Sequence, residues 1–186
     1  ATNVARLTRV WSYSLQSDAA PAATGRGGAG GANSEATPIV VNGVMYLPAA
    51  NRVVALQADT GKELWAYRIT GAVPSRRGVA YWPGDSANPP RIVFTAGRRL
   101  IALNAGTGTP VASFGSEGEV DMATPYNSVP LAYKNVLVVG ANSPPGASGG
   151  IGNPRAFDAR TGVKLWEFSS VPQPGELGHD TWEGDS

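Results

Sequence analysis

The chain has 186 residues, of which 42% are hydrophobic and 16% are charged, and its formal net charge is +1. The apolar fraction suffices for the core of one domain, and the balanced charge argues against nucleic acid as a partner. The chain has no cysteine and one histidine, His179, which excludes disulfides, thiolate metal sites and sites that need two imidazoles. Its 24 glycines and 15 prolines favour turns and short strands over helices.

The N-terminal part predicts an isolated strand followed by a loop. Near residues 4–15, the segment Trp11-Ser12-Tyr13 matches Trp65-Ala66-Tyr67, 54 residues later, and predicts an outer strand without the rest of its sheet. Residues 18–33 are rich in glycine and alanine and predict a flexible loop. The chain begins at Ala1 without a methionine and ends without a turn or cap signal, so we expect it to be a piece of a longer protein.

A segment of similar sequence occurs three times and carries the pair Thr-Gly. The glycines of these pairs are Gly61, Gly108 and Gly162, separated by 47 and 54 residues. Such a period is typical of the blades of a β-propeller and too long for most helical repeats.

Each repeat has the turn signals of a small antiparallel sheet. Asn42-Gly43 is a strong two-residue hairpin turn, Lys134-Asn135 takes the same place in the third repeat, and the second repeat turns near Ala96-Gly97. The Thr-Gly pair then joins a third strand to a fourth. The sequence therefore predicts an all-β fold, a β-propeller segment of about three and a half four-stranded antiparallel blades. The blades are expected near residues 35–70, 78–115 and 125–170, with residues 171–186 as the start of the next segment.

The fourth strand of the first and third repeats carries a tryptophan. We expect Trp65 and Trp166 to be largely buried, because a large flat side chain at this place covers the adjacent sheet. The second repeat has Ala112 instead, so its interface is expected to be looser or filled by another side chain.

The repeats, of the form Ala-x-Asp-x-x-Thr-Gly-x-x-x-Trp, resemble the tryptophan-docking motifs of the quinoprotein alcohol and glucose dehydrogenases. These are periplasmic enzymes that use pyrroloquinoline quinone (PQQ) on an eight-bladed propeller. Residues 77–85 resemble the family's segment Arg-Gly-x-x-Tyr-Trp-Pro-Gly-Asp, residues 35–40 its first inner strand, and residues 172–185 its stretch before the fifth blade. The resemblance runs along nearly the whole chain and implies the N-terminal part of the propeller.

The resemblance implies that PQQ lies on the propeller axis, held by polar side chains of the inner strands. Arg77 can pair a planar carboxylate with two hydrogen bonds, and Glu35 matches the family's inner-strand glutamate near the quinone. Asn127 or Ser128 would place an amide or a hydroxyl against the cofactor. Each has a plainer alternative, an exposed charge for Arg77 and Glu35 and a turn residue for Asn127 and Ser128.

Two further assignments follow from the resemblance. Gly149 and Gly150 fall near the family loop that brings backbone close to the quinone, although ordinary loop flexibility explains these glycines nearly as well. Calcium or magnesium is implied for the complete protein, with no metal ligand assigned in this chain. No catalytic residue is assigned either, because the family's carboxylate base lies beyond the segment that ends at Asp185.

The implied function is oxidation of an alcohol or a sugar by hydride transfer to PQQ in the periplasm, with a quinone or a cytochrome as electron acceptor. The isolated fragment is expected to be inactive, and the sequence leaves a membrane anchor of the complete protein open. Residues 73–76 replace the adjacent cysteines that alcohol dehydrogenases of the family have there, which favours the glucose dehydrogenases or a related subgroup. The alternative is a non-catalytic propeller scaffold that binds protein partners, as in outer-membrane assembly factors with similar repeats.

Overall fold

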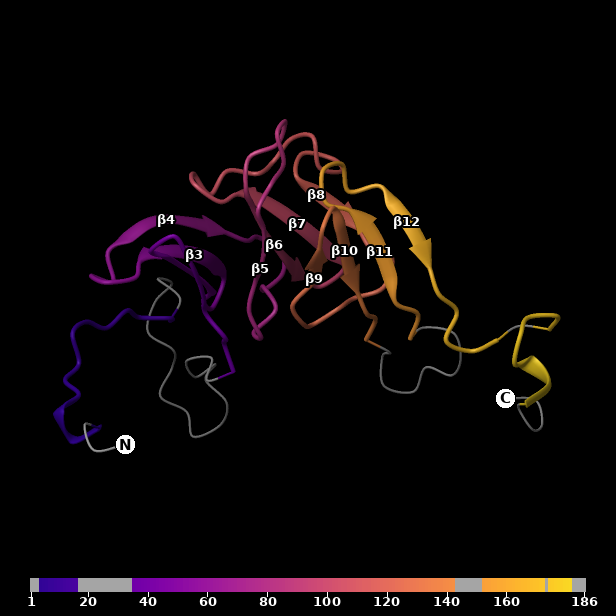
Figure 1. Ribbon diagram of the computed structural model, residues 1–186, viewed down its shortest axis with the longest axis horizontal. Coiled ribbons are helices and arrows are strands. Elements are labelled where there is room, and N and C mark those ends of the chain that lie inside the picture. The colour runs from indigo at the N-terminus through magenta and orange to yellow at the C-terminus, as the bar shows by residue number, and fades with distance from the viewer. Residues whose placement is uncertain (1–3, 17–34, 143–151, 173, 182–186) are drawn as a thin grey trace.

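The structure is a computed structural model that describes residues 4–16, 35–142, 152–172 and 174–181. Within these residues the fold is nearly all β, with three four-stranded antiparallel sheets and two 3-10 turns, Val4–Arg6 and His179–Thr181. The three sheets lie side by side in chain order, with the second sheet between the first and the third (Figure 1). No helix of this described part is long and apolar enough to span a bilayer.

In every sheet, neighbouring strands are also neighbours in the chain, as expected for successive hairpins. The first sheet consists of β1 (Ile39–Val41), β2 (Val44–Pro48), β3 (Arg52–Gln57) and β4 (Glu63–Arg68). The second consists of β5 (Ala80–Trp82), β6 (Arg91–Ala96), β7 (Arg99–Asn104) and β8 (Glu119–Asp121). The third consists of β9 (Leu131–Tyr133), β10 (Val136–Val139), β11 (Arg155–Asp158) and β12 (Lys164–Glu167). The hairpin residues Asn42 and Gly43 have φ angles of 50° and 79°, as their turn signal requires.

The second sheet is buried on both faces because its side chains alternate between two cores. On β6, Ile92 and Phe94 belong to the core shared with the first sheet, whereas Val93 belongs to the core shared with the third. All of β6 is buried, and all of β12 is exposed. A strand that is buried at every position therefore marks the middle of the stack.

A tryptophan joins the first sheet to the second. The indole of Trp65 lies against Gly108, where a Cβ atom would come within 2.5 Å of the ring. Its Nε1 donates a hydrogen bond of 2.9 Å to the carbonyl of Ala105. Gly108 has a φ angle of 72°, so the backbone and the indole both favour glycine here.

Between the second and third sheets, no indole lies against the Thr-Gly turn at Gly162, although Trp82 donates a hydrogen bond of 2.8 Å to the carbonyl of Lys134. Val120 and Phe114 cover Gly162, and the buried guanidinium of Arg91 donates a hydrogen bond of 2.8 Å to the carbonyl of Ala159. Ala159 is the counterpart of Ala105 in the third repeat. Other side chains therefore fill the place left by Ala112, as one of the two expectations stated.

The segment before the first sheet is not a strand, which corrects the outer strand expected near residues 4–15. After the turn Val4–Arg6 the chain continues without strand pairing. Trp11 nevertheless lies against Gly61 and donates a hydrogen bond of 3.1 Å to the carbonyl of Ala58. Packing of Trp11, hydrogen bonds from Arg52 and one backbone hydrogen bond from Ala50 to Leu15, rather than a β-ladder, attach this segment to the first sheet.

The second sheet extends past the expected limit of its blade at residues 78–115, because its outer strand β8 lies at Glu119–Asp121. Pro110 makes only an isolated bridge with Leu103, at the place where the other repeats begin their fourth strand. Proline has no N–H for a ladder hydrogen bond. The chain turns, buries Phe114 and only then pairs with β7.

Trp166 is 45% exposed, so the expectation that it would be largely buried is wrong for this chain. It lies on β12, the outer strand of the third sheet, and no further sheet of the described residues packs there. Val163, Leu165 and Phe168 beside it are exposed as well. The described stack therefore ends in an apolar edge.

Candidate functional site

The three segments that carry the predicted cofactor residues meet at Gly78. Thr37, just after Glu35, forms a parallel bridge with Gly78, and its N–H donates a hydrogen bond of 3.2 Å to the carbonyl of Arg77. A Cβ atom on Gly78 would lie 2.9 Å from the Thr37 carbonyl oxygen and 3.2 Å from Val129.

Gly78 also has a φ angle of 142°, which side chains rarely allow. The starts of the three inner strands can approach one another because this position is glycine. The structure thus brings the segments of Glu35, Arg77 and Asn127-Ser128 to one place, although they are far apart in the chain.

The predicted side chains differ in their surroundings. Arg77 is exposed, and its guanidinium has no hydrogen-bond or ion-pair partner among the described residues. Glu35 and Asn127 are exposed too, while Ser128 is half-buried. The Asn127 N–H donates a hydrogen bond of 3.3 Å to Oδ1 of Asn142, which holds this segment beside the end of β10. An unpaired guanidinium can bind a carboxylate through two parallel hydrogen bonds.

A small cavity borders two of these segments. Its volume is about 210 Å³, and it lies between residues 73–76 and residues 125–127, with Gly97 at the turn of β6 and β7. Arg76 and Asn127 both line it. Residues 73–76 stand where alcohol dehydrogenases of the resembled family have adjacent cysteines, so the cavity lies against that part of the candidate site.

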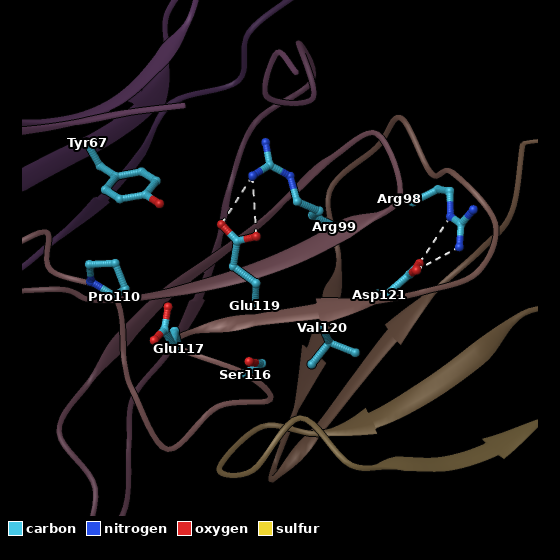
Figure 2. Close-up of a pocket in the computed structure, with 9 residues that line it drawn as sticks. All are labelled: Tyr67, Arg98, Arg99, Pro110, Ser116, Glu117, Glu119, Val120 and Asp121. Atoms are coloured by element: carbon cyan, nitrogen blue, oxygen red, sulfur yellow. Dashed lines mark hydrogen bonds and ion pairs between the residues drawn. The ribbon is translucent and has the colours of Figure 1, made fainter. Parts of the chain in front are cut away.

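A larger cavity of about 700 Å³ lies elsewhere, between β4 and β8, and contains none of the predicted residues. Figure 2 shows its ion pairs: Arg98 binds Asp121 with contacts of 2.6 and 3.1 Å, and Arg99 binds Glu119 at 3.3 Å. The hydrogen bond from Arg98 holds the pKa of Asp121 below its usual value. The arginines here are already paired, so this cavity lacks the free cation that Arg77 offers.

Three buried arginines were not predicted from the sequence. Arg52 is 4% exposed and donates to the carbonyls of Ser14 and Gln16. Arg91 is 1% exposed and stacks 5.0 Å above the ring of Trp82, and burial lowers the pKa of its guanidinium. Arg155 is 3% exposed and donates to the carbonyls of Met122 and Gly140. An arginine at the first position of a largely apolar strand was the signal for all three. Arg91 and Arg155 join neighbouring sheets, and Arg52 joins the N-terminal segment to the first sheet.

Three predictions fall on residues that the structure does not describe. One is the loop expected at residues 18–33. Gly149 and Gly150 fall outside the described residues, as does the end of the segment 172–185. Within the described ranges, no group of three or more His, Asp or Glu side chains could hold a metal ion.

Comparison with known proteins gives the same family along the whole chain. Residues 1–186 match the family described as the β-propeller domain of PQQ-dependent glucose, ethanol and alcohol dehydrogenases. The chain is 35% identical over 189 residues to the dehydrogenase subunit of alcohol dehydrogenase (quinone) from Gluconobacter oxydans, covering 92% of this chain and 22% of that protein. It is 36% identical over 184 residues to quinohemoprotein alcohol dehydrogenase from Comamonas testosteroni, covering 92% and 23%. The chain thus spans less than a quarter of the length of these relatives.

Solved structures agree with the fold. The crystal structure of the Comamonas testosteroni quinohemoprotein alcohol dehydrogenase superposes with a TM-score of 0.60 at 31% identity, over 76% of this chain and 22% of that one. A europium-containing methanol dehydrogenase superposes with a TM-score of 0.67 at 25% identity, over 95% and 29%. The predicted all-β propeller segment of four-stranded antiparallel blades is therefore confirmed, and the chain belongs to the family of PQQ-dependent dehydrogenases, within its β-propeller domain.

Proposed function

We propose that this chain is the N-terminal part of a periplasmic quinoprotein dehydrogenase that oxidises an alcohol by hydride transfer to PQQ. The observation that carries the proposal is the meeting of three inner-strand segments at Gly78, with the unpaired guanidinium of Arg77 beside them. The relatives reported above are named alcohol dehydrogenases, which favours an alcohol over a sugar despite the missing cysteines. Because the family is one of dehydrogenases, we prefer an enzyme to the scaffold alternative.

The residues present fit one side of a planar group that carries carboxylates. The Arg77 guanidinium offers a fork of N–H donors that matches a carboxylate. The half-buried Ser128 hydroxyl and the Asn127 amide can each donate one more hydrogen bond from the neighbouring strand start. Arg77 would thus hold the cofactor, and Asn127 or Ser128 would orient it.

When bound, PQQ supplies the acceptor for the hydride that leaves the alcohol carbon. The side chains of this chain bind and orient, and none of them is assigned the removal of the alcohol proton. We propose that the carboxylate base and the ligands of a calcium or magnesium ion come from the rest of the complete polypeptide. Both ions take oxygen ligands, which carboxylates and carbonyls provide.

The electron acceptor and the cellular location belong to the same proposal. A relative from Methylobacterium organophilum, 30% identical over 185 residues and covering 82% of this chain, is named methanol dehydrogenase [cytochrome c] subunit 1. A cytochrome or a quinone is therefore the class of acceptor that we propose. Release of the complete polypeptide with the periplasmic fraction would support the location, and retention with the cytoplasmic fraction would contradict it.

The test of the function uses the complete polypeptide, expressed from the whole gene and purified without cofactor. Dye-linked oxidation is measured with PQQ alone, with calcium alone and with both, on primary alcohols and on glucose. We expect oxidation of alcohols that depends on PQQ. Activity that does not depend on PQQ, or none with any alcohol or sugar, would contradict the proposal.

A further inference from the structure

Thr95 is a fully buried residue of β6 that touches two of the three segments of the candidate site. Its carbonyl accepts a hydrogen bond of 2.7 Å from the N–H of Ser75. Its hydroxyl donates a hydrogen bond of 3.1 Å to the carbonyl of Ser128. One residue therefore connects the segment before Arg77 with the segment that carries Ser128.

Ser75 extends this connection to Arg77. Ser75 is itself buried, and its Oγ accepts a hydrogen bond of 3.3 Å from the N–H of Arg77. Thus two hydrogen bonds separate the backbone of Arg77 from Thr95, and one separates that of Ser128 from Thr95. The Thr95 hydroxyl thus binds the Ser128 segment, and the Thr95 backbone carbonyl binds the segment before Arg77.

Thr95 lies on a strand that is held in place on both sides. β6 pairs with β5 on one side and with β7 on the other, and every residue of β6 is buried. A hydroxyl held by such a strand fixes the carbonyl that it binds, because a buried carbonyl left without a donor is costly. Valine has the same shape as threonine and would leave the Ser128 carbonyl without this donor.

We infer that Thr95 is a positioning residue for the cofactor, which sets the spacing between Arg77 and Ser128 so that both can bind one PQQ molecule. The inference rests on the proposed function. It goes beyond that function because Thr95 does not itself contact the ligand. If the distance between the two binding residues is fixed before PQQ binds, affinity rises, because binding then orders fewer side chains and less backbone.

The test compares Thr95→Val, Thr95→Ser and wild type in the complete polypeptide prepared without cofactor. PQQ is titrated, and the quenching of tryptophan fluorescence gives the dissociation constant. Thermal unfolding of the cofactor-free form is measured in parallel. Thr107→Val is the matched control, because the Thr107 hydroxyl bonds only within its own turn, to Oγ1 of Thr109 at 2.8 Å.

Thr95→Val is expected to weaken PQQ binding about tenfold, the size of effect that one lost buried hydrogen bond produces. Thr95→Ser keeps the hydroxyl and is expected to stay within about twofold of wild type, as is Thr107→Val. If the valine variant does not fold, Thr95→Ala removes the same hydroxyl with less crowding, and the same tenfold loss is expected.

Two results would overturn the inference while the proposed function stands. One is wild-type affinity in the hydroxyl-free variant, even if its unfolding temperature falls, because the role of Thr95 would then be only structural. The other is equal weakening by valine and serine, because the hydroxyl would then not be responsible. If the wild-type polypeptide itself does not bind PQQ, the proposed function fails and the inference fails with it.

Discussion

Arg91 takes, between the second and third sheets, the place that an indole has between the first and second. Its guanidinium donates to the carbonyls of Ala159 at 2.8 Å and Arg160 at 2.7 Å, and to Oδ1 of Asn88 at 3.0 Å. The ring of Trp82 covers one of its faces. A buried guanidinium stays charged, because its pKa starts far above neutral, so these are charge-assisted bonds.

Replacing Arg91 by methionine should lower the free energy of unfolding by about 3 kcal/mol, because the buried carbonyl of Ala159 and the partly buried carbonyl of Arg160 lose their donor. Urea unfolding of this chain measures the change. Arg98→Met is the control, since Arg98 forms an exposed ion pair with Asp121 and should cost less than about 1 kcal/mol. Equal losses in the two variants would show that Arg91 does not join the sheets.

Asp158 gives the Thr-Gly turn of the third repeat a dependence on pH. Its carboxylate accepts hydrogen bonds from the N–H groups of Arg160 and Thr161, at 2.8 and 3.0 Å. Burial raises the pKa of Asp158, but these backbone hydrogen bonds lower it more, and the net pKa lies below the usual value. Asn104 makes the same two bonds in the second repeat with an uncharged amide.

The carboxylate of Asp158 should stabilise the fold fully at neutral pH, above the pKa of about 4 in the unfolded chain. That stability is lost as the pH falls through the lowered pKa of the folded state. Asp158→Asn should therefore cost about 1 kcal/mol at pH 7, and the difference from wild type should shrink toward pH 3. Urea midpoints at both pH values test this, and a difference that grows on acidification would contradict the sign.

Among the strands, the contacts of Trp65 on β4 and Trp166 on β12 predict that their replacement by alanine lowers the free energy of unfolding by different amounts. Trp65→Ala should lower the free energy of unfolding by about 3 kcal/mol, because it empties a packed interface and removes the shorter of two hydrogen bonds to the Ala105 carbonyl. Trp166→Ala is the matched control and should cost far less, since that indole is 45% exposed in this chain. Urea unfolding of both variants decides the point, and similar midpoints would mean that the first interface is already open.

The sheets could be predicted from the sequence where local turn chemistry fixes them. Asn42-Gly43 and Lys134-Asn135 mark their hairpins because the first residue of each pair adopts a positive φ angle, 50° in both. The position of β8 could not be predicted, because Pro110 removes a donor but does not say where pairing resumes. The exposure of Trp166 could not be predicted either, because it depends on what packs against β12.

The resemblance led us to expect the three segments around one cofactor, but not the contact at which they meet. Their convergence depends on Gly78, whose φ angle of 142° and close contacts appear only in three dimensions. In the sequence, Thr95 looks like any threonine of a β-strand. Its function becomes visible only when Ser75 and Ser128 are found on either side of it.

At the scale of the whole molecule, the three described sheets supply one side of the proposed cofactor site. Arg77, Asn127 and Ser128 all come from the inner-strand starts of the second and third sheets. The chain spans less than a quarter of the relatives compared above, which is consistent with further groups lying in the complete polypeptide.

The 186-residue chain alone should not oxidise alcohols or sugars, even with PQQ and calcium supplied. Binding from one side does not exclude water or bring a base to the substrate, and each of these losses removes several powers of ten in rate. A dye-linked assay on monodisperse chain checks this. Turnover that depends on PQQ would show that the catalytic residues lie within these 186 residues.

The most direct measurement for the central claim is a crystal structure of the complete polypeptide with PQQ bound. We expect a carboxylate of PQQ within hydrogen-bond distance of the Arg77 guanidinium, and Asn127 or Ser128 in contact with the same molecule. PQQ bound away from the three segments that meet at Gly78, with Arg77 in solvent, would contradict the account.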